Sequence, residues 1–587
     1  MDRRTNLCIL GCVLSLVAAG CFKTNEVTGL KRPKSKDAGA QDEPETPSTA
    51  GRGPGNPVDA GKPQGPNDPV SQPAGRCVLG GYCAEIEIQA PRSADLLFVV
   101  DNSGSMRQEQ AALREQFPKL IQVLVTGLKS SGERFPPLRD LHLGVVSSDM
   151  GLAGIPNNFP GCNTQRHING GDDGVLLHPG NTGPGCQAEY PPWLAYTQGK
   201  DDPQKTAANF GCIAALGTTG CGFEQQLEAG LKALWPKNYV DADGNVYPPE
   251  KNPILFLSTT NEGRFGHGDV PVTQGGNGGF LRANSLVAIV IVTDEEDCSS
   301  KNTGHFLSTN DPANPLSKQG INLRCFYNKQ NLFEIDRYVK GYQGLRPGRE
   351  EDVLFAAIVG VPKELVSAEA RASVNFSDQK ARDEFYDNIL GDTRMVERPM
   401  NESVPAIANV APSCSRTDSL GERADAYPPR RMVEVAKGFG QNAVVQSICQ
   451  DDFGPALDAV IDLTSTRTKL QCLPRELRRG SNGKIDCELL WELPKDGSSC
   501  KDLPFLSAVS SPRAKTNDRG GPTCKVAQLA ITTLGQEPSG QGFFYDDFTD
   551  ERAGACVDSS AARIAYSSGI EQPQSVRAVL DCSKKAE

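Results

Sequence analysis

The sequence DLLFVVDNSGSM, residues 95–106, decides the fold of this chain. Its apolar half is continuous from Leu96 to Val100, which is typical of a strand buried on both faces in a parallel sheet. Its polar half starts with Asp101 and continues through Ser103 and Ser105, just before a helical pattern. In open α/β sheets, ligands bind beyond the carboxyl ends of strands, so this segment predicts an α/β fold with a site at its polar end.

Four other segments have the composition of a buried strand. They are residues 141–147, 286–293, 353–361 and, more weakly, 443–448. Between or after the strands, apolar residues recur at helical spacing over residues 113–128, 223–235, 378–390, 432–439 and 453–463. Pro118 is expected to kink the first of these helices or to mark its effective start. Strands that alternate with helices predict an α/β domain with a mostly parallel sheet and right-handed crossovers.

Two long segments interrupt this alternation. Residues 151–211 are rich in Gly, Pro and Asn, and a second segment covers residues 236–284. Loops of this length inside a compact domain are usually functional or decorative insertions, and we expect both to rim the site. In the second, Asp241 to Asn245 resembles a calcium loop, but the flanking pairs Tyr239-Val240 and Val246-Tyr247 favour a hairpin.

The polar loop after the first strand offers oxygen ligands for a hard cation. Ser103 and Ser105 are two residues apart and can turn both hydroxyls to one side, while Gly104 eases the backbone between them. Asp101 adds negative charge, directly or through a water. Mg²⁺ prefers about six oxygen ligands at roughly 2.1 Å. The alternative is purely structural, with Asp101 capping the next helix and the serines forming a turn.

The placement of Asp-x-Ser-x-Ser between a buried strand and a helix resembles the metal-ion-dependent adhesion site of the von Willebrand factor A family. The resemblance covers roughly residues 91–466 and implies a doubly wound, mostly parallel, Rossmann-like sheet with Mg²⁺, or Mn²⁺ or Ca²⁺, at its top. It implies Asp101, Ser103 and Ser105 as ligands, and a vacant corner that accepts a carboxylate from a protein or surface partner. By position, Asp294 matches the family's second-loop carboxylate, with Glu295 or Asp297 able to assist.

The family also places a Thr ligand in a third loop, here residues 217–224. Counting six residues back from Leu227 reaches Cys221 and not a Thr, so this register departs from the family's pattern. Thr219 is the first choice for this ligand, Thr218 the second, and Glu224 a carboxylate substitute.

The N-terminus carries an export signal. Arg3 and Arg4 precede an apolar run that is too short to span a bilayer comfortably, and the run ends in Ala18-Ala19-Gly20-Cys21. This sequence resembles a bacterial lipobox, which implies a signal peptide over residues 1–20 and lipidation of Cys21; the alternative is an ordinary signal peptide cut near Ala19. Phe22, where retention in the inner membrane would favour Asp, points to the outer membrane. The whole arrangement is similar to A-domain surface lipoproteins of myxobacteria and related delta-proteobacteria.

The rest of the chain divides by composition. Residues 21–76 are dense in Pro, Gly, Ser, Asp and Lys, and predict a disordered tether to the α/β domain at residues 77–466. After about Arg467, six cysteines and alternating runs at 525–531 and 576–580 predict a small disulfide-rich β domain over residues 467–587.

Cysteine usage agrees with export. Removing Cys8, Cys12 and Cys21 leaves 16 of the 19 cysteines, an even number that suggests disulfides. Neighbours in sequence suggest the pairs Cys77–Cys83, Cys162–Cys186, Cys212–Cys221, Cys298–Cys325 and Cys414–Cys449. No CxxC pair occurs and there are only five histidines, which disfavours zinc.

The net charge of −11 argues against nucleic acid and against binding to anionic lipid, so the membrane is expected to be contacted through the lipid anchor only. No nucleotide loop, zinc helix or nucleophile elbow occurs, and His305 is the least implausible partner for a nucleophilic serine. The sequence therefore favours an envelope lipoprotein that binds through a metal and is not an enzyme. Two alternatives stay open, a structural lipoprotein with an inactive metal site and a metal-assisted hydrolase.

Overall fold

The computed structural model describes residues 76–586 with gaps. The gaps are residues 87–92, 130–131, 133–134, 136, 156–158, 160–161, 163–166, 168, 179–184, 242–243, 284, 308–314, 317–318, 405–407, 418–420, 451, 469–471, 496, 534–535, 537, 549–561, 568–569 and 571–575. The predicted signal peptide, the lipidation residue Cys21 and the predicted tether up to residue 75 lie outside the described residues. Within the described part, no helix combines the length and the apolar character needed to cross a bilayer.

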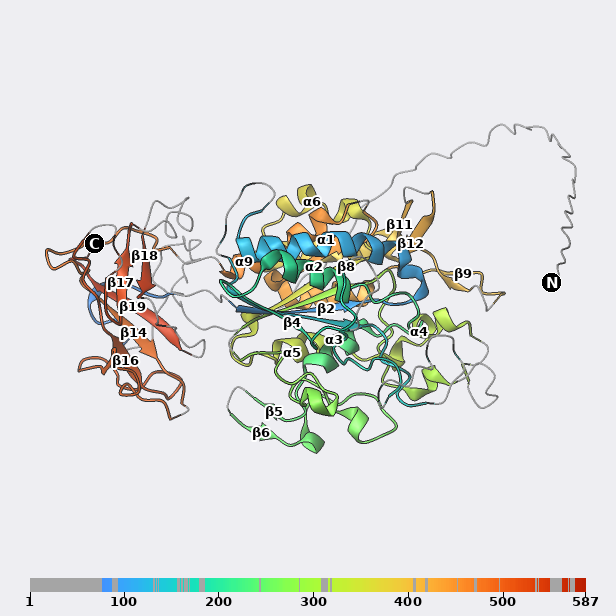
Figure 1. The fold of residues 1–587 in the computed structure, drawn as a ribbon, viewed down its shortest axis with the longest axis horizontal. Helices are drawn as coiled ribbons and strands as arrows, with labels where there is room; N and C mark the ends of the chain where they lie inside the picture. The colour runs from blue at the N-terminus through green and yellow to red at the C-terminus, as the bar shows by residue number, and fades with distance from the viewer. Residues whose placement is uncertain are drawn as a thin grey trace, which may run out of the picture. The chain divides into compact units, whose positions relative to one another are not determined.

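A six-stranded sheet forms the centre of the α/β part (Figure 1). In spatial order its strands are β13 (Ala443–Ser447), β8 (Val353–Val359), β7 (Leu286–Val292), β2 (Ser93–Val100), β3 (Asp140–Ser147) and β4 (Leu194–Thr197). The first five are parallel and were all predicted, which confirms a mixed α/β fold with a mostly parallel sheet. Strand β4 lies in the segment predicted as an insertion, and pairs antiparallel with β3.

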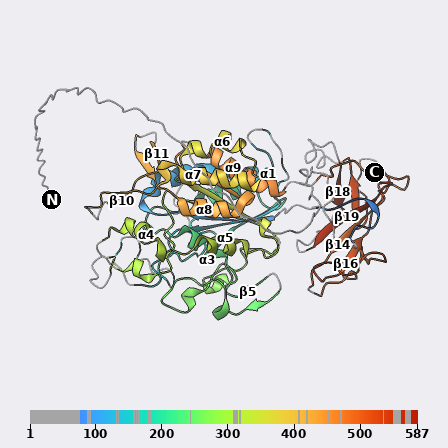
Figure 2. The same cartoon turned by 180° about the vertical axis from the view of Figure 1, so that it is seen from behind.

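Helices cover both faces of this sheet (Figures 1 and 2). On one face α1 (Arg107–Thr126), α2 (Pro203–Ile213) and α9 (Gly454–Thr468) pack on the side chains of Leu96 and Phe98. On the other, Leu97 and Val99 pack in a second core with α3 (Gln226–Leu234), α5 (Ile335–Gln343), α7 (Gln379–Gly391) and α8 (Arg430–Phe439). Successive residues of a strand point to opposite faces, which explains why β2 is continuously apolar from Leu96 to Val100.

Helix α1 differs from its prediction. It begins at Arg107, directly after the polar loop, and runs through Pro118 without ending there. Phe117, Leu120 and Ile121 are fully buried on the sheet, and this packing outweighs the cost of a proline inside the helix. Helices α2 and α5 were not predicted, and neither were the short helices α4 (Arg324–Tyr327) and α6 (Ala368–Ala372).

Three small hairpin-like sheets decorate the α/β part. They are β5 (Tyr239–Val240) with β6 (Val246–Tyr247), β9 (Pro399–Met400) with β10 (Asn409–Val410), and β11 (Cys414–Thr417) with β12 (Arg423–Ala426). The first confirms the predicted hairpin: Asp241 accepts hydrogen bonds from the backbone and side chain of Asn245, so its carboxylate closes the turn.

A separate antiparallel sheet is built from both ends of the described chain. Its order is β1 (Gly80–Glu85), β19 (Arg577–Ser583), β14 (Cys487–Glu492), β16 (Thr523–Val526) and β15 (Leu506–Ala508), and it has its own core around Trp491. Strands β17 (Phe543–Asp546) and β18 (Arg563–Tyr566) form a further pair. The boundary expected at residue 77 is therefore wrong, because β1 pairs with β19 and belongs to this β module. The α/β part is an insertion between β1 and β14.

Disulfides join several cysteines as expected and others differently. The pairs Cys77–Cys83, Cys298–Cys325 and Cys414–Cys449 are confirmed. The pairs Cys162–Cys186 and Cys212–Cys221 are wrong, since the chain forms Cys162–Cys221 and, nested within that loop, Cys186–Cys212. In the β module, Cys487 pairs with Cys582 and Cys500 with Cys524.

Candidate functional site

Asp101 is held in place by donors from three loops at the carboxyl end of the sheet. Its Oδ1 accepts hydrogen bonds from the Ser103 backbone N–H at 2.8 Å and the Ser148 hydroxyl at 3.2 Å, and its Oδ2 accepts one from the Thr293 hydroxyl at 2.6 Å. The side chain is fully buried, and burial raises its pKa although these hydrogen bonds oppose the shift. Asp101 therefore ties the loops after β2, β3 and β7 together.

Three of the predicted ligands lie in one contiguous row of oxygens. The Ser103 and Ser105 hydroxyls are 3.0 Å apart, and the Ser105 hydroxyl donates to Oδ1 of Asp294 at 3.1 Å. Ser103 and Asp294 are buried, whereas Ser105 is exposed. Residues 189 positions apart in the chain thus meet because β2 and β7 are parallel neighbours whose carboxyl ends share an edge.

The oxygen spacing fits a divalent cation. An octahedral ion with oxygens at about 2.1 Å places neighbouring ligands about 3.0 Å apart, which matches both separations in the row. Burial, followed by repulsion from Asp101 and Glu109, raises the pKa of Asp294 well above its usual range. A cation between Ser103, Ser105 and Asp294 would supply the positive charge that this carboxylate lacks.

The third loop is fixed to the first. The amide of Gln110 donates to the backbone oxygens of Asp101 and Gly217, and its oxygen accepts from the Gly217 N–H. The Gly220 N–H donates to the Asn102 carbonyl at 2.8 Å. The predicted ligand Thr219 lies next to these contacts, with an exposed side chain.

A different residue of the third loop faces the site. Glu224 is 8% exposed and lines a cavity of about 360 Å³ together with Ser103 and Ser105. Burial, then repulsion from Asp101, raises the pKa of Glu224 well above its usual range. Glu295, also in the cavity wall, has its pKa raised by burial and then by Asp294. The cavity wall thus contains more carboxylate side chains than cationic side chains.

The other acids after β7 have structural roles. Asp297 accepts hydrogen bonds from the Leu227 N–H at the start of α3 and from the Arg431 guanidinium. Glu296 accepts from the Arg431 N–H in the first turn of α8. Carboxylates are favourable at helix N-termini, where backbone N–H groups lack partners inside the helix. Both residues expected to assist the metal line the cavity, but Asp297 already accepts hydrogen bonds from Leu227 and Arg431.

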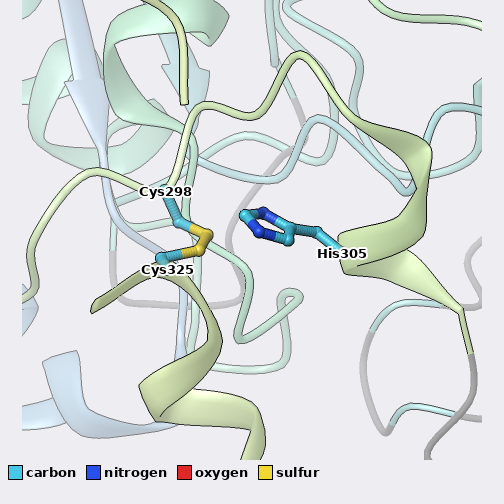
Figure 3. Close-up of side chains that lie close together, drawn as sticks. All are labelled: Cys298, His305 and Cys325. Carbon is cyan, nitrogen blue, oxygen red and sulfur yellow. A yellow bond between two sulfur atoms is a disulfide. The ribbon is translucent and has the colours of Figure 1, made fainter. Parts of the chain in front are cut away.

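Cys298, His305 and Cys325 lie close together beside this region (Figure 3). Two cysteines and a histidine are a common zinc set, but here the two sulfurs form a disulfide and are not thiolates. His305 is fully buried, with Nε2 3.1 Å from the Asn331 amide, and burial lowers its pKa to about 4. His305, the least implausible partner for a nucleophilic serine, thus lies against a disulfide.

Three residues that support the site were not predicted. Ser148, Thr293 and Gln110 each donate a hydrogen bond to Asp101. Thr293 could have been found, because it ends the β7 apolar run directly before Asp294. Ser148 and Gln110 have no local sequence signature, since their role depends on which loops meet.

Comparison of the sequence with protein-family models finds no match, and comparison with curated proteins finds none either.

Proposed function

We propose that this chain is a lipid-anchored protein of the bacterial cell envelope, at the outer membrane, whose doubly wound α/β domain of von Willebrand factor A type binds a partner through a divalent cation. The observation that carries the proposal is the row of oxygens from Ser103 through Ser105 to Asp294, at 3.0 and 3.1 Å. These groups come from two strand ends, and among the described residues the charged neighbours that most affect Asp294 are the acids Asp101 and Glu109.

The residues of such a site have different roles toward the cation. Ser103, Ser105 and Asp294 supply direct oxygen ligands, and one further ligand comes from the third loop, where the sequence offers Thr219, Thr218 or Glu224. Asp101 already accepts three hydrogen bonds, which suits it to bind through a water and to orient the loop. When bound, Mg²⁺, Mn²⁺ or Ca²⁺ would act as a Lewis acid with an open coordination position for a carboxylate oxygen of a protein or surface ligand. The exposed Ser105 lies at the side from which a partner could approach.

The test uses Mn²⁺ to measure two things, whether the site binds a divalent cation and whether the bound ion keeps an open coordination position. Electron paramagnetic resonance should show one Mn²⁺ bound per chain, lost in the double variant Ser103→Ala, Ser105→Ala. Water proton relaxation should be enhanced by the bound ion and should decrease when acetate displaces the exchangeable water. The exposed Ser507 provides a control, since Ser507→Ala lies in the β module and should leave both signals unchanged.

Two results would contradict the proposal. Absence of Mn²⁺ binding would favour a structural lipoprotein with an inactive site. Bound Mn²⁺ without acetate-sensitive relaxation would mean that all coordination positions of the ion are occupied, so that it cannot bind a partner's carboxylate.

A further inference from the structure

We propose that Glu224, and not Thr219, is the third-loop ligand of the cation, so that this site carries one more carboxylate than its sequence pattern implies. The inference rests on the proposed function, because it assigns a role toward the same ion. It concerns the residue whose identity the sequence left open.

Burial and position favour Glu224. It is 8% exposed and lines the same cavity as the Ser103 and Ser105 hydroxyls, whereas the Thr219 side chain is exposed. The loop between them is pinned by the Cys162–Cys221 disulfide, three residues before Glu224. After this bridge Glu224 is buried in the cavity wall, with Asp101, the residue that follows β2, as its strongest charged neighbour.

The charges around Glu224 also point to a missing cation. Among the described residues, the charged neighbours that most affect the pKa of Glu224 are Asp101, Asp294 and Asp149, and all three are acidic. Buried carboxylates normally have a cationic partner or a metal, because an unpaired buried charge is costly. By contrast Glu228, one turn later in α3, is paired with Arg337 at 2.8 Å.

An extra carboxylate changes what the site prefers. With Asp101, Glu224 and Asp294 near it, a divalent ion keeps no excess positive charge, since three negative charges oppose two positive ones. The ion is therefore held more tightly, while a partner's carboxylate is attracted less strongly than at a site with two carboxylates. Glu224 thus favours retention of the metal at the expense of affinity for an anionic ligand.

The experiment compares three single variants of the full chain by calorimetric titration with Mn²⁺. Glu224→Gln should weaken Mn²⁺ binding by at least about tenfold, as expected for the loss of a group that shapes a metal site. Thr219→Val tests the alternative ligand and should bind Mn²⁺ as the wild type does. Glu434→Gln is the matched control, because Glu434 lines the same cavity from α8 and the variant removes the same charge.

A second readout separates ligation from a structural role. At saturating Mn²⁺, Glu224→Gln should bind acetate more tightly than the wild type, because one opposing charge is gone. Removing a repelled buried charge should also leave the metal-free melting temperature unchanged or higher, so a weakened Mn²⁺ affinity would not reflect unfolding.

The outcomes are distinct. If the wild type binds Mn²⁺ and Glu224→Gln binds it as tightly as Glu434→Gln does, the assignment of Glu224 is overturned while the proposed function stands. If Thr219→Val loses Mn²⁺ and Glu224→Gln does not, Thr219 is the ligand and the assignment is again overturned. If the wild type binds no Mn²⁺, both the assignment and the proposed function are overturned.

Discussion

Replacing Asp294 by Asn should separate the apo stability of the α/β part from its stabilisation by metal. Asp294 is 2% exposed, and Asp101 and Glu109 repel its charge. An Asn at this position still accepts the hydrogen bond from Ser105, so the metal-free variant should be at least as stable as the wild type. Its neutral oxygen is a much poorer ligand for a divalent cation than a carboxylate is.

The expected change in metal-dependent stability follows from linkage. Mg²⁺ at a hundredfold excess over its Kd should add about 2.7 kcal/mol to the free energy of unfolding of the wild type. Loss of even an outer-sphere partner typically weakens metal binding about 10–100-fold. At the same Mg²⁺ concentration, the stabilisation of Asp294→Asn should therefore fall to between about 1.4 and about 0.4 kcal/mol.

Urea unfolding with and without Mg²⁺ measures this difference, with EDTA in the metal-free arm. Tryptophan fluorescence is a suitable signal because Trp193 and Trp235 both lie in the α/β part. Asp336→Asn is the control, since Asp336 is an exposed carboxylate paired with Lys340 on α5. If Asp294→Asn and Asp336→Asn gain the same stability from Mg²⁺ as the wild type, Asp294 is not a ligand and the site geometry has been misinterpreted.

Three other perturbations test the surroundings of the site. The buried acids Asp294 and Glu224 have raised pKa values in the folded state, so the folded chain keeps protons that the unfolded chain releases. The free energy of unfolding of the metal-free protein should therefore fall as pH rises above about 4. The affinity for Mg²⁺ should increase over the same pH range, because the ion binds the deprotonated carboxylates. Calorimetry in buffers of different ionisation enthalpy would detect the released protons, and an affinity independent of pH would contradict the charge assignment. Replacing Cys162 and Cys221 by Ser should cost about 2–4 kcal/mol of stability and weaken Mn²⁺ binding, because their bridge pins the third loop; unchanged Mn²⁺ affinity would argue against this role. Lys232→Met should cost about 3–5 kcal/mol in urea unfolding, because it leaves Asp173 buried without the 2.7 Å partner that lowers its pKa; a neutral effect would show that Asp173 is otherwise compensated.

The parts of the fold that were predictable are those with a strong local pattern. Strands β7 and β8 are apolar throughout and β2 is apolar from Leu96 to Val100, as burial on both faces requires, while β3 and β13 have shorter apolar stretches. Strand β4 has four residues, and α5 buries Tyr338 and Tyr342 among charged neighbours, so neither stands out from its sequence. The pairing of β1 with β19 joins segments about 500 residues apart, and no local pattern encodes such a contact.

The candidate site divides in the same way. Asp101, Ser103, Ser105 and Asp294 follow strand ends directly, so their convergence could be inferred from the order of parallel strands. The orientation of the third loop could not be inferred, because it depends on nested disulfides that sequence proximity mispaired. Whether Thr219 or a neighbour faces the edge of the sheet is decided by that long-range constraint.

The discontinuous β module determines how this protein can be cut into independently folding pieces. A fragment starting at residue 467 would lack β1 and would leave β19 as an open sheet edge, which is a template for aggregation. A fragment covering residues 77–466 would in turn carry β1 with nothing to pair with. Expression of the α/β part alone therefore calls for a start after the β1 segment, and the β module calls for residues 76–86 to be joined to its C-terminal portion by a short linker. A single protease cut between β2 and α9 would leave both products held together by the pairing of β1 with β19.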